Sequence, residues 1–421
     1  MKSHYKRIGD YVTQIKLKNI DGAISLLRGI SINKYFMPSV ANIIGTDLSK
    51  YRVVKKNQFA FNPMHVGRDE VLPISMLESN NPVIVSPAYI VFRVKDESEL
   101  LPEYLMMWCR RSEFDRQAWF MTDNSVRGGF SWADFSDMGI PIPPIEKQHE
   151  IVREYNIVND RIVLNEQLTK KLEDTVQVIY KQWFVDFEFP ISKEYAEYVC
   201  QPELEGEPYK TSGGKFIQCE KLQKEVPVNW LTSTVGSYSK VISGYAFKSI
   251  WWTKSGSPVI KIGSFKDNTV NYSTLDYVSS DKVLSKDRFS CKPGDIVVAM
   301  TGFTMGKIGL IPPIFERFYI NQRVGKFDLG KKPTERAAFL YCYLISSQFT
   351  EEIASIGGDS RQANVSSDEI EGFVLLIPNV IELDKFNSLM ANSIEKMMAL
   401  AHQNHHLNIL GEIVLQKMSK A

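Results

Sequence analysis

The sequence predicts a mixed α/β fold in which two globular domains alternate with two long helices. Three features predict this arrangement: the chain repeats itself, each copy begins with short β-rich runs, and each copy ends in a long helical pattern. We expect the two helices to pair as an antiparallel coiled coil, which gives the fold a pseudo-two-fold axis. The predicted segments are 1–144 (first domain), 145–187 (first helix), 188–222 (connector), 223–379 (second domain) and 380–421 (second helix).

The internal repeat has a constant offset. Ile142 aligns with Ile377, 235 residues further on, and the same register holds without a gap across about ninety residues, from Phe92 to Ile179 in the first copy. Chance explains any single match but not a sustained register, so the chain is a tandem duplication. The same offset aligns Phe92 with Phe327, Leu105 with Leu340, Ser131 with Ser366, Ile151 with Phe386 and Ile179 with Val414.

Each globular domain combines short strands with a helix. Strand-like runs include "NQFAF" and "VIVSPAYIVFRV" in the first copy and "SPVIKIG" and "GDIVVAM" in the second. Apolar residues at helical spacing occur in "PEYLMMWCRRSEFDRQAWF" and "ERAAFLYCYLISSQFTEEIA". These patterns predict two related α/β domains.

The two long helices carry a coiled-coil seam. The first begins after Pro143 and Pro144, which suit a helix entry but not its interior. Apolar residues step by four and three in both segments, and a period of 3.5 is typical of helices that pair. At 1.5 Å per residue each rod is roughly 60 Å long. The predicted seam is Ile151, Tyr155, Val158, Ile162, Leu172, Val176, Ile179, Phe386, Met390, Met397, Leu400, Leu407 and Val414.

The segment between the repeats, 188–222, is rich in Glu, Lys, Pro and Gly and lacks an apolar period. We therefore predict an exposed connector.

Composition limits the class of protein. The 421 residues suffice for two to three domains, and 44% apolar with 24% charged content is typical of a soluble globular chain. The net charge of +1 is low for a protein that binds DNA alone, because phosphate neutralisation supplies most of that affinity. Any DNA site is thus local, or partner subunits supply the positive field.

The cysteines and the N-terminal residues favour the cytoplasm. The five cysteines are scattered without a C-x-x-C pair, which argues against a zinc site or disulfide framework and for a reducing compartment. The start "MKSHYKRIGDYV" has no apolar signal region, and no run approaches eighteen apolar residues. We expect neither secretion nor membrane insertion.

The duplication indicates a function. Antiparallel rods place two globular domains at the ends of a spacer, and B-DNA repeats its groove face every 34–36 Å or so. Two linked domains that differ in sequence predict a bipartite, asymmetric double-stranded DNA target with a fixed unread gap.

The stretch "AMTGFTMGKIGLIPP" (299–313) resembles a phosphate-binding loop only superficially. Three residues rather than four separate Gly302 from Gly306, and Ile308 rather than Ser or Thr follows Lys307. The first copy keeps a glycine and a base, Gly67 and Arg68, without the motif. A tight turn with a cation and free backbone N–H groups suits DNA better than ATP.

Catalytic and metal motifs are missing from the sequence. The "IPPI" stretches lack the polar and aromatic ends of an amino-methyltransferase motif, and there is no H-E-x-x-H. His402, His405 and His406 are closely spaced on a helix, where a solvated polar face is the better interpretation than a metal site. We predict no catalytic residue and no metal ligand.

Side chains that can hydrogen-bond to base edges cluster in loops at matched places in the two copies. For any single residue, an ordinary solvated loop is the alternative. The predicted DNA contacts are Arg28, Lys34, Asn62, His65, Arg68 and Arg127 in the first copy, and Tyr245, Lys248, Thr301, Lys307, Asn321, Gln322, Arg323, Arg361, Gln362 and Asn364 in the second.

Several strings make the chain resemble the specificity subunits of type I restriction–modification systems. They are "IPIPPIEKQHEIV" (140–152), "KQWFVDFEFP" (181–190), "GEPYKTSGG" (206–214), "FAFNPMHVG" (59–67) and "GDIVVAMTGFTMGKIGLI" (294–311). The likeness extends over nearly the whole chain. "ISKEYAEYVCQPELE" departs from the family pattern as an insertion, and "CEKLQKEVPVNW" is a loose version of the entry to the second domain.

The resemblance implies a non-catalytic DNA-specificity subunit with two target-recognition domains. It implies two methyltransferase subunits bound through the helices, and restriction and translocase subunits that join them. S-adenosylmethionine, ATP and magnesium then belong to those partners, and the complex serves defence against foreign DNA.

Two alternatives stay open at this point. One is a self-contained restriction enzyme or methyltransferase with duplicated DNA-binding domains; the other is an adaptor whose rods only join proteins. The aromatic stretch "YKQWFVDFEF" at the end of the first rod also has two interpretations. It packs in a core, or it is a docking surface for the methyltransferase subunit.

Overall fold

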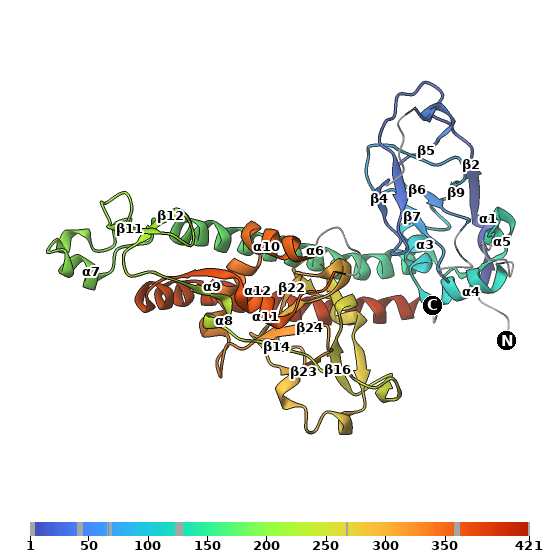
Figure 1. Ribbon diagram of the computed structural model, residues 1–421. Helices are drawn as coiled ribbons and strands as arrows, with labels where there is room; N and C mark the ends of the chain where they lie inside the picture. Colours follow the sequence, from blue (N-terminus) through green and yellow to red (C-terminus); the bar gives the residue numbers. More distant parts are fainter. Residues whose placement is uncertain are drawn as a thin grey trace. The chain divides into compact units, whose positions relative to one another are not determined.

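The computed structural model describes residues 5–39, 45–64, 66, 70–122, 129–266, 268–357 and 363–419 (Figure 1). Its contacts divide the chain into two compact units. Unit 1 comprises Met1–Arg161 and Ile409–Ala421, and unit 2 comprises Ile162–Asn408. The long helices α6 (Ile145–Phe184) and α12 (Val380–Lys417) contribute residues to both units.

Unit 1 is built on a four-stranded sheet of order β2-β9-β6-β7, whose neighbours are all antiparallel. Helix α3 lies against this sheet through a core of buried aromatic and aliphatic side chains. The elements of unit 1 are β1 (Tyr5–Arg7), α1 (Ile8–Tyr11), β2 (Val12–Ile15), β3 (Arg28–Ile30), β4 (Phe36–Pro38), β5 (Arg52–Val54), β6 (Gln58–Phe61), β7 (Ile74–Met76), β8 (Val83–Val85), β9 (Ile90–Val94), α3 (Pro102–Cys109), α4 (Ser112–Met121), α5 (Trp132–Asp137) and β10 (Gly139–Pro141).

Unit 2 repeats this sheet as β14-β24-β21-β22 and adds a five-stranded sheet of order β15-β19-β16-β23-β20. In the added sheet β16 and β23 are parallel, whereas the other pairs are antiparallel. The elements of unit 2 are α7 (Lys193–Tyr198), β11 (Phe216–Cys219), β12 (Lys224–Pro227), β13 (Leu231–Thr234), α8 (Val235–Tyr238), β14 (Val241–Ser243), β15 (Trp252–Thr253), β16 (Ser257–Ile260), β17 (Phe265–Lys266), β18 (Thr269–Val270), β19 (Asp276–Val278), β20 (Ser290–Cys291), β21 (Ile296–Ala299), β22 (Ile308–Leu310), β23 (Phe318–Ile320), β24 (Val324–Phe327), α9 (Thr334–Leu344), α10 (Ser347–Gly357), α11 (Ser367–Gly372) and β25 (Val374–Ile377).

The duplication is visible in small packing details. A Cβ atom on Gly9 of α1 would lie 2.7 Å from the Cβ of Ser136 in α5, and one on Gly236 of α8 would lie 2.8 Å from the Cβ of Glu371 in α11. Ser136 and Glu371 are related by the offset of the repeat. Each unit therefore needs a glycine at the same place, because a larger side chain would push the two short helices apart.

The long helices run antiparallel, as the seam predicts (Figure 1). In unit 2 the Trp183 ring packs against Phe386 at a centroid distance of 5.5 Å, and the Asn165 amide donates to Asn404 Oδ1 at 2.7 Å. In unit 1 the Lys417 ammonium pairs with Glu154 at 2.6 Å. Residue numbers thus rise along one helix as they fall along its partner, and the antiparallel coiled coil is confirmed.

Every predicted seam residue is at least half-buried. Asn165 interrupts the apolar seam, yet it is only 2% exposed and its amide also donates to Gln403 Oε1 at 2.9 Å. A satisfied polar pair fixes helix register because sliding leaves it unpaired. Buried are Ile151, Tyr155, Val158, Val176, Phe386, Met390, Met397, Leu400 and Val414, and half-buried are Ile162, Leu172, Ile179 and Leu407.

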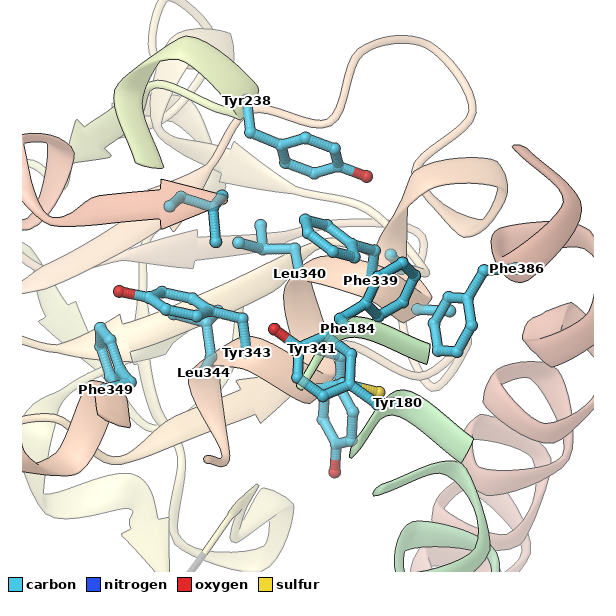
Figure 2. Close-up of a cluster of buried hydrophobic side chains, with 14 of the residues drawn as sticks. Tyr180, Phe184, Tyr238, Phe339, Leu340, Tyr341, Tyr343, Leu344, Phe349 and Phe386 are labelled. Atoms are coloured by element: carbon cyan, nitrogen blue, oxygen red, sulfur yellow. The ribbon is translucent and has the colours of Figure 1, made fainter. Parts of the chain in front are cut away.

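Aromatic residues at the end of α6 belong to the core of unit 2. Phe184 lies between the rings of Phe339 on α9 and Phe386 on α12, at centroid distances of 5.0 and 4.8 Å. Figure 2 shows these three rings together, with Tyr180 beside them. Phe187 and Trp183 are also buried. The structure therefore supports core packing for "YKQWFVDFEF" and argues against a docking surface made of these rings.

The connector predicted over 188–222 is not simply exposed. It contains α7 and β11, and its backbone turns around a stack in which Phe189 packs on Tyr209 at 4.5 Å and on Trp230 at 4.9 Å. Ile191 is also buried. The sequence does not reveal this stack, because its aromatic residues are irregularly spaced and packing of this kind leaves no periodic signal.

No helix in the described part of the chain is long and apolar enough to cross a lipid bilayer.

Candidate nucleic-acid interface

In each unit, the loop after one strand of the four-stranded sheet is hydrogen-bonded to the segment before a short helix. The strand is β21 and the helix α11 in unit 2, and they are β6 and α5 in unit 1. In unit 2 the Val365 N–H donates to the Met300 carbonyl at 2.9 Å. In unit 1 the Phe130 N–H donates to the Pro63 carbonyl at 3.0 Å. Phe130 and Val365 are related by the repeat offset, so the same two loops meet in each domain.

Equivalent capping boxes fix the second of these loops. Ser131 caps α5 and exchanges hydrogen bonds with Asp134, and Ser366 caps α11 and exchanges them with Glu369. Each serine hydroxyl accepts a backbone N–H that the first helical turn leaves free. The aligned serines of the repeat therefore have a structural role, and they hold the loop before each helix in place.

An open hollow of about 300 Å³ lies where these loops meet in unit 2, and we call it hollow 2. The Met300 N–H donates to the Arg323 carbonyl at 2.9 Å, which brings the 321–323 turn alongside. Its lining is mostly polar and offers hydroxyl and amide groups. The lining residues are Ser243, Met300, Gln322, Asn364, Val365, Ser366, Ser367 and Asp368.

Unit 1 has a hollow of about 670 Å³ at the equivalent place, hollow 1. It differs in chemistry, because methionine and aromatic side chains replace amides. Its lining residues are Pro63, Met64, Ile90, Met121, Thr122, Gly129, Phe130, Ser131, Trp132 and Asp134. Two equivalent hollows with unlike linings are what two domains with different ligands require.

The structure brings several predicted DNA contacts of the second copy together at hollow 2. Gln322 and Asn364 line it, and the Thr301 hydroxyl donates to Asn364 Oδ1 at 2.5 Å. Arg323 is exposed beside Gln322, and Lys307 is half-buried at the end of the 300–307 loop. Among the described residues neither cation forms an ion pair, so both remain available to phosphate groups.

Tyr245 and Lys248 lie beside this group. Tyr245 forms a parallel β-bridge with Asn321, and its ring packs on Phe247 and Phe289 at 5.2 and 5.4 Å. The exposed Lys248 ammonium lies 5.5 Å from the centre of the Trp251 ring. The β-bridge therefore places Tyr245 next to the 321–323 turn.

In the first copy the predicted contacts are more scattered. Asn62 follows β6, and its side-chain oxygen accepts the Met64 N–H at 3.1 Å. Arg28 is half-buried on β3. Five predicted contacts lie outside the described residues: His65, Arg68, Arg127, Arg361 and Gln362.

The placement of Lys34 contradicts its prediction as a DNA contact. Its side chain is only 5% exposed, and its ammonium pairs with Asp115 at 2.7 Å. It also donates to the Cys109 carbonyl and lies 5.0 Å from the Phe114 ring centre. Burial lowers the pKa of Lys34 and raises the pKa of Asp115, and the ion pair opposes both shifts. Lys34 is a structural residue.

Replacing Lys34 by Met will lower the free energy of unfolding by about 3 kcal/mol, because Asp115 then stays buried without its partner. Urea denaturation measures the change. A second substitution, Asp115→Asn, keeps an acceptor for the Leu72 N–H and should recover most of the loss. Lys50→Met is the matched control, since Lys50 is 74% exposed and its replacement should cost less than about 0.5 kcal/mol. Equal effects of the two lysine substitutions would contradict the assignment.

The glycine–lysine loop is not a phosphate-binding loop. It connects the antiparallel strands β21 and β22, whereas such a loop leads from a strand into a helix. Gly302 has φ +71° with open space around it. Gly306 has φ +82°, and a Cβ there would lie 2.8 Å from the Ile353 Cγ2 in α10. The glycines therefore serve a tight turn that packs against α10.

Sequence reasoning did not single out four polar residues of hollow 2. Ser366, Ser367 and Asp368 belong to the start of α11, and Ser243 ends β14. The repeat offset aligns "VSSD" with "FSWA", and the match of Ser131 with Ser366 marked this loop without identifying its polar residues as contacts. Ser243 comes near Ser367 through the fold alone, with 2.5 Å between the hydroxyl oxygens.

The described residues include no group of three His, Cys, Asp or Glu side chains that could hold a metal ion. His402 and His406 are one helical turn apart, with their Nε2 atoms at 2.8 Å, and His405 packs against Phe315. The five cysteines form no disulfide.

Comparisons with known proteins agree with this geometry. A family model for the type I restriction modification DNA specificity domain matches residues 74–174. The chain is 20% identical over 429 residues to the type I restriction enzyme HindI specificity subunit of Haemophilus influenzae, covering 92% of this chain and 91% of that protein. It is 22% identical over 252 residues to the MjaVIII specificity subunit of Methanocaldococcus jannaschii, covering 59% of this chain and 53% of that one.

A solved structure has the same fold. The crystal structure of a type I restriction-modification S subunit from M. genitalium matches with a TM-score of 0.50 and 14% identity, covering 98% of this chain and 95% of that chain. The chain is thus similar in sequence, over most of its length, to a DNA-specificity subunit of a type I restriction–modification system, and it shares the fold of a solved S subunit.

Proposed function

We propose that this chain recognises a bipartite, asymmetric double-stranded DNA sequence and directs adenine methylation or cleavage by partner subunits. The observation that carries the proposal is the pair of equivalent hollows with unlike linings. Amide groups such as Gln322 and Asn364 suit adenine edges, whereas an apolar wall suits a thymine methyl group. One domain then recognises each half-site, and the halves differ because the linings differ.

The chain has no catalytic role in this proposal, since it acts as the specificity subunit. Two methyltransferase subunits and the restriction and translocase subunits carry the chemistry. S-adenosylmethionine, ATP and magnesium are cofactors of those partners, and the complex works in the cytoplasm. A self-contained restriction enzyme or methyltransferase is not favoured.

The helices offer surfaces for two methyltransferase subunits. Val178 on α6 is 65% exposed in unit 2, and Ile413 on α12 is 49% exposed in unit 1. These two residues are related by the repeat offset, so each unit presents one apolar side chain at the same place. A repeated surface supports the binding of two copies of one partner.

Methylation mapping of host DNA tests the function. Deleting the chain should remove adenine methylation from one bipartite sequence motif, and restoring the chain should restore it. The double variant Gln322→Ala, Asn364→Ala should recognise one half of the motif less selectively. The expected loss is about 1–3 kcal/mol of discrimination against the wrong base, seen as weaker methylation of that half-motif. Unchanged methylation without the chain would refute the proposal. Methylation of DNA by the purified chain with S-adenosylmethionine alone would favour the self-contained enzyme.

A further inference from the structure

Phe303 is an exposed aromatic residue at the tip of the loop between β21 and β22. It lies in the 3₁₀ turn Gly302–Thr304, and 83% of its surface is exposed. Its ring forms no aromatic contact with any other described residue. This exposure leaves the ring of Phe303 accessible to a binding partner.

The loop holds Phe303 in a fixed position. The Gly302 N–H donates to the Ala363 carbonyl and the Met305 N–H to the Gly302 carbonyl, at 2.9 and 3.0 Å. The Gly306 N–H donates to the Ala299 carbonyl at 2.9 Å. These bonds close the turn on both sides of the tip. Phe303 therefore cannot fold back onto the sheet without breaking them.

Polar groups surround the base of this tip. Thr301 and Asn364 are hydrogen-bonded to each other, and Asn364 also lines hollow 2 with Gln322. DNA-binding proteins often combine such polar groups with an apolar wedge that enters between bases and unstacks them. The polar groups then contact base edges while the wedge contacts base faces.

We infer that Phe303 is a wedge that partly unstacks one base step in the half-site recognised by unit 2. This inference rests on the proposed DNA-recognition function and adds a deformation of the DNA to it.

The experiment uses the full chain assembled with its methyltransferase subunits and a duplex that carries the mapped target. 2-Aminopurine replaces one base at a time, and its fluorescence rises when a base loses its stacking partner. The wild-type complex should raise the signal at one step of the half-site recognised by unit 2. Phe303→Ala should abolish that rise and weaken binding about tenfold, whereas Phe303→Leu should retain part of both.

Phe120→Ala is the matched control, because Phe120 is 86% exposed in unit 1 and undergoes the same chemical change. Phe120→Ala should leave the 2-aminopurine signal in the half-site recognised by unit 2 unchanged. An unchanged signal and affinity with Phe303→Ala would overturn the inference. So would weaker assembly with the methyltransferase subunits at an unchanged signal, since Phe303 would then contact a protein. Wild-type binding without sequence preference would overturn the proposed function and this inference together.

Discussion

Exchanging Leu231–Ile377 for the matching segment of a relative with a different target will change one half of the recognised DNA sequence and leave the other half unchanged. The exchange is structurally clean because Leu231 and Ile377 are directly paired at the ends of β13 and β25. The chain enters and leaves the second domain at adjacent points, so the two ends of the exchanged segment lie next to each other. These strand ends replace the boundaries 223–379 as the junctions for the exchange.

The expected effect is large. Specific DNA binding exceeds non-specific binding by roughly 10³–10⁷, so the original half-site should lose essentially all preference. Methylation mapping in cells reads out both halves at once. The donor segment should keep an aromatic residue at the position of Phe339, because that ring packs on α6 and α12.

The reciprocal exchange is the control. Tyr5 pairs with Pro141 at the equivalent strands β1 and β10, so exchange of Tyr5–Pro141 should change the other half alone. A single exchange that changed both halves, or neither, would show that the two domains do not recognise DNA separately.

The features predicted well were those that repeat along the sequence. The seam from Ile151 to Val414 follows a 3.5-residue period, and helices α6 and α12 pair through it. The constant offset aligned Ser131 with Ser366, and both cap the short helix beside a hollow. Periodic and repeated patterns can be recognised in a single sequence because many positions indicate the same structure.

The features that failed depend on partners far apart in the sequence. Lys34 pairs with Asp115, 81 residues away, and nothing near Lys34 distinguishes it from an exposed lysine. Phe189 packs on both Tyr209 and Trp230 across a segment without periodicity. The parallel pairing of β16 with β23, for which the sequence made no prediction, likewise joins segments about sixty residues apart. Such contacts are set by tertiary packing, which local patterns do not encode.

Replacing Phe184 by Ala will destabilise unit 2 by about 4 kcal/mol, because a fully packed aromatic ring leaves a cavity that rigid neighbours fill only in part. The ring contacts Phe339 and Phe386 (Figure 2). It also lies 5.7 Å from the Trp230 ring, so three separate segments lose a shared partner. Urea denaturation measures the loss, and hydrogen exchange should place it at α9 and the start of α12. The amides around Trp108, in the core of unit 1, should keep their protection.

Val185→Ala is the neighbouring control, since Val185 is 51% exposed and its truncation should cost less than about 0.5 kcal/mol. The pair of variants also separates the two interpretations of the aromatic segment at the end of α6. A core residue loses stability whether or not a partner is present, because its contacts are internal to unit 2. A docking residue keeps the stability of the isolated chain and loses only the binding of the methyltransferase subunits. Full stability with weakened assembly in Phe184→Ala would therefore overturn the assignment of this ring to the core.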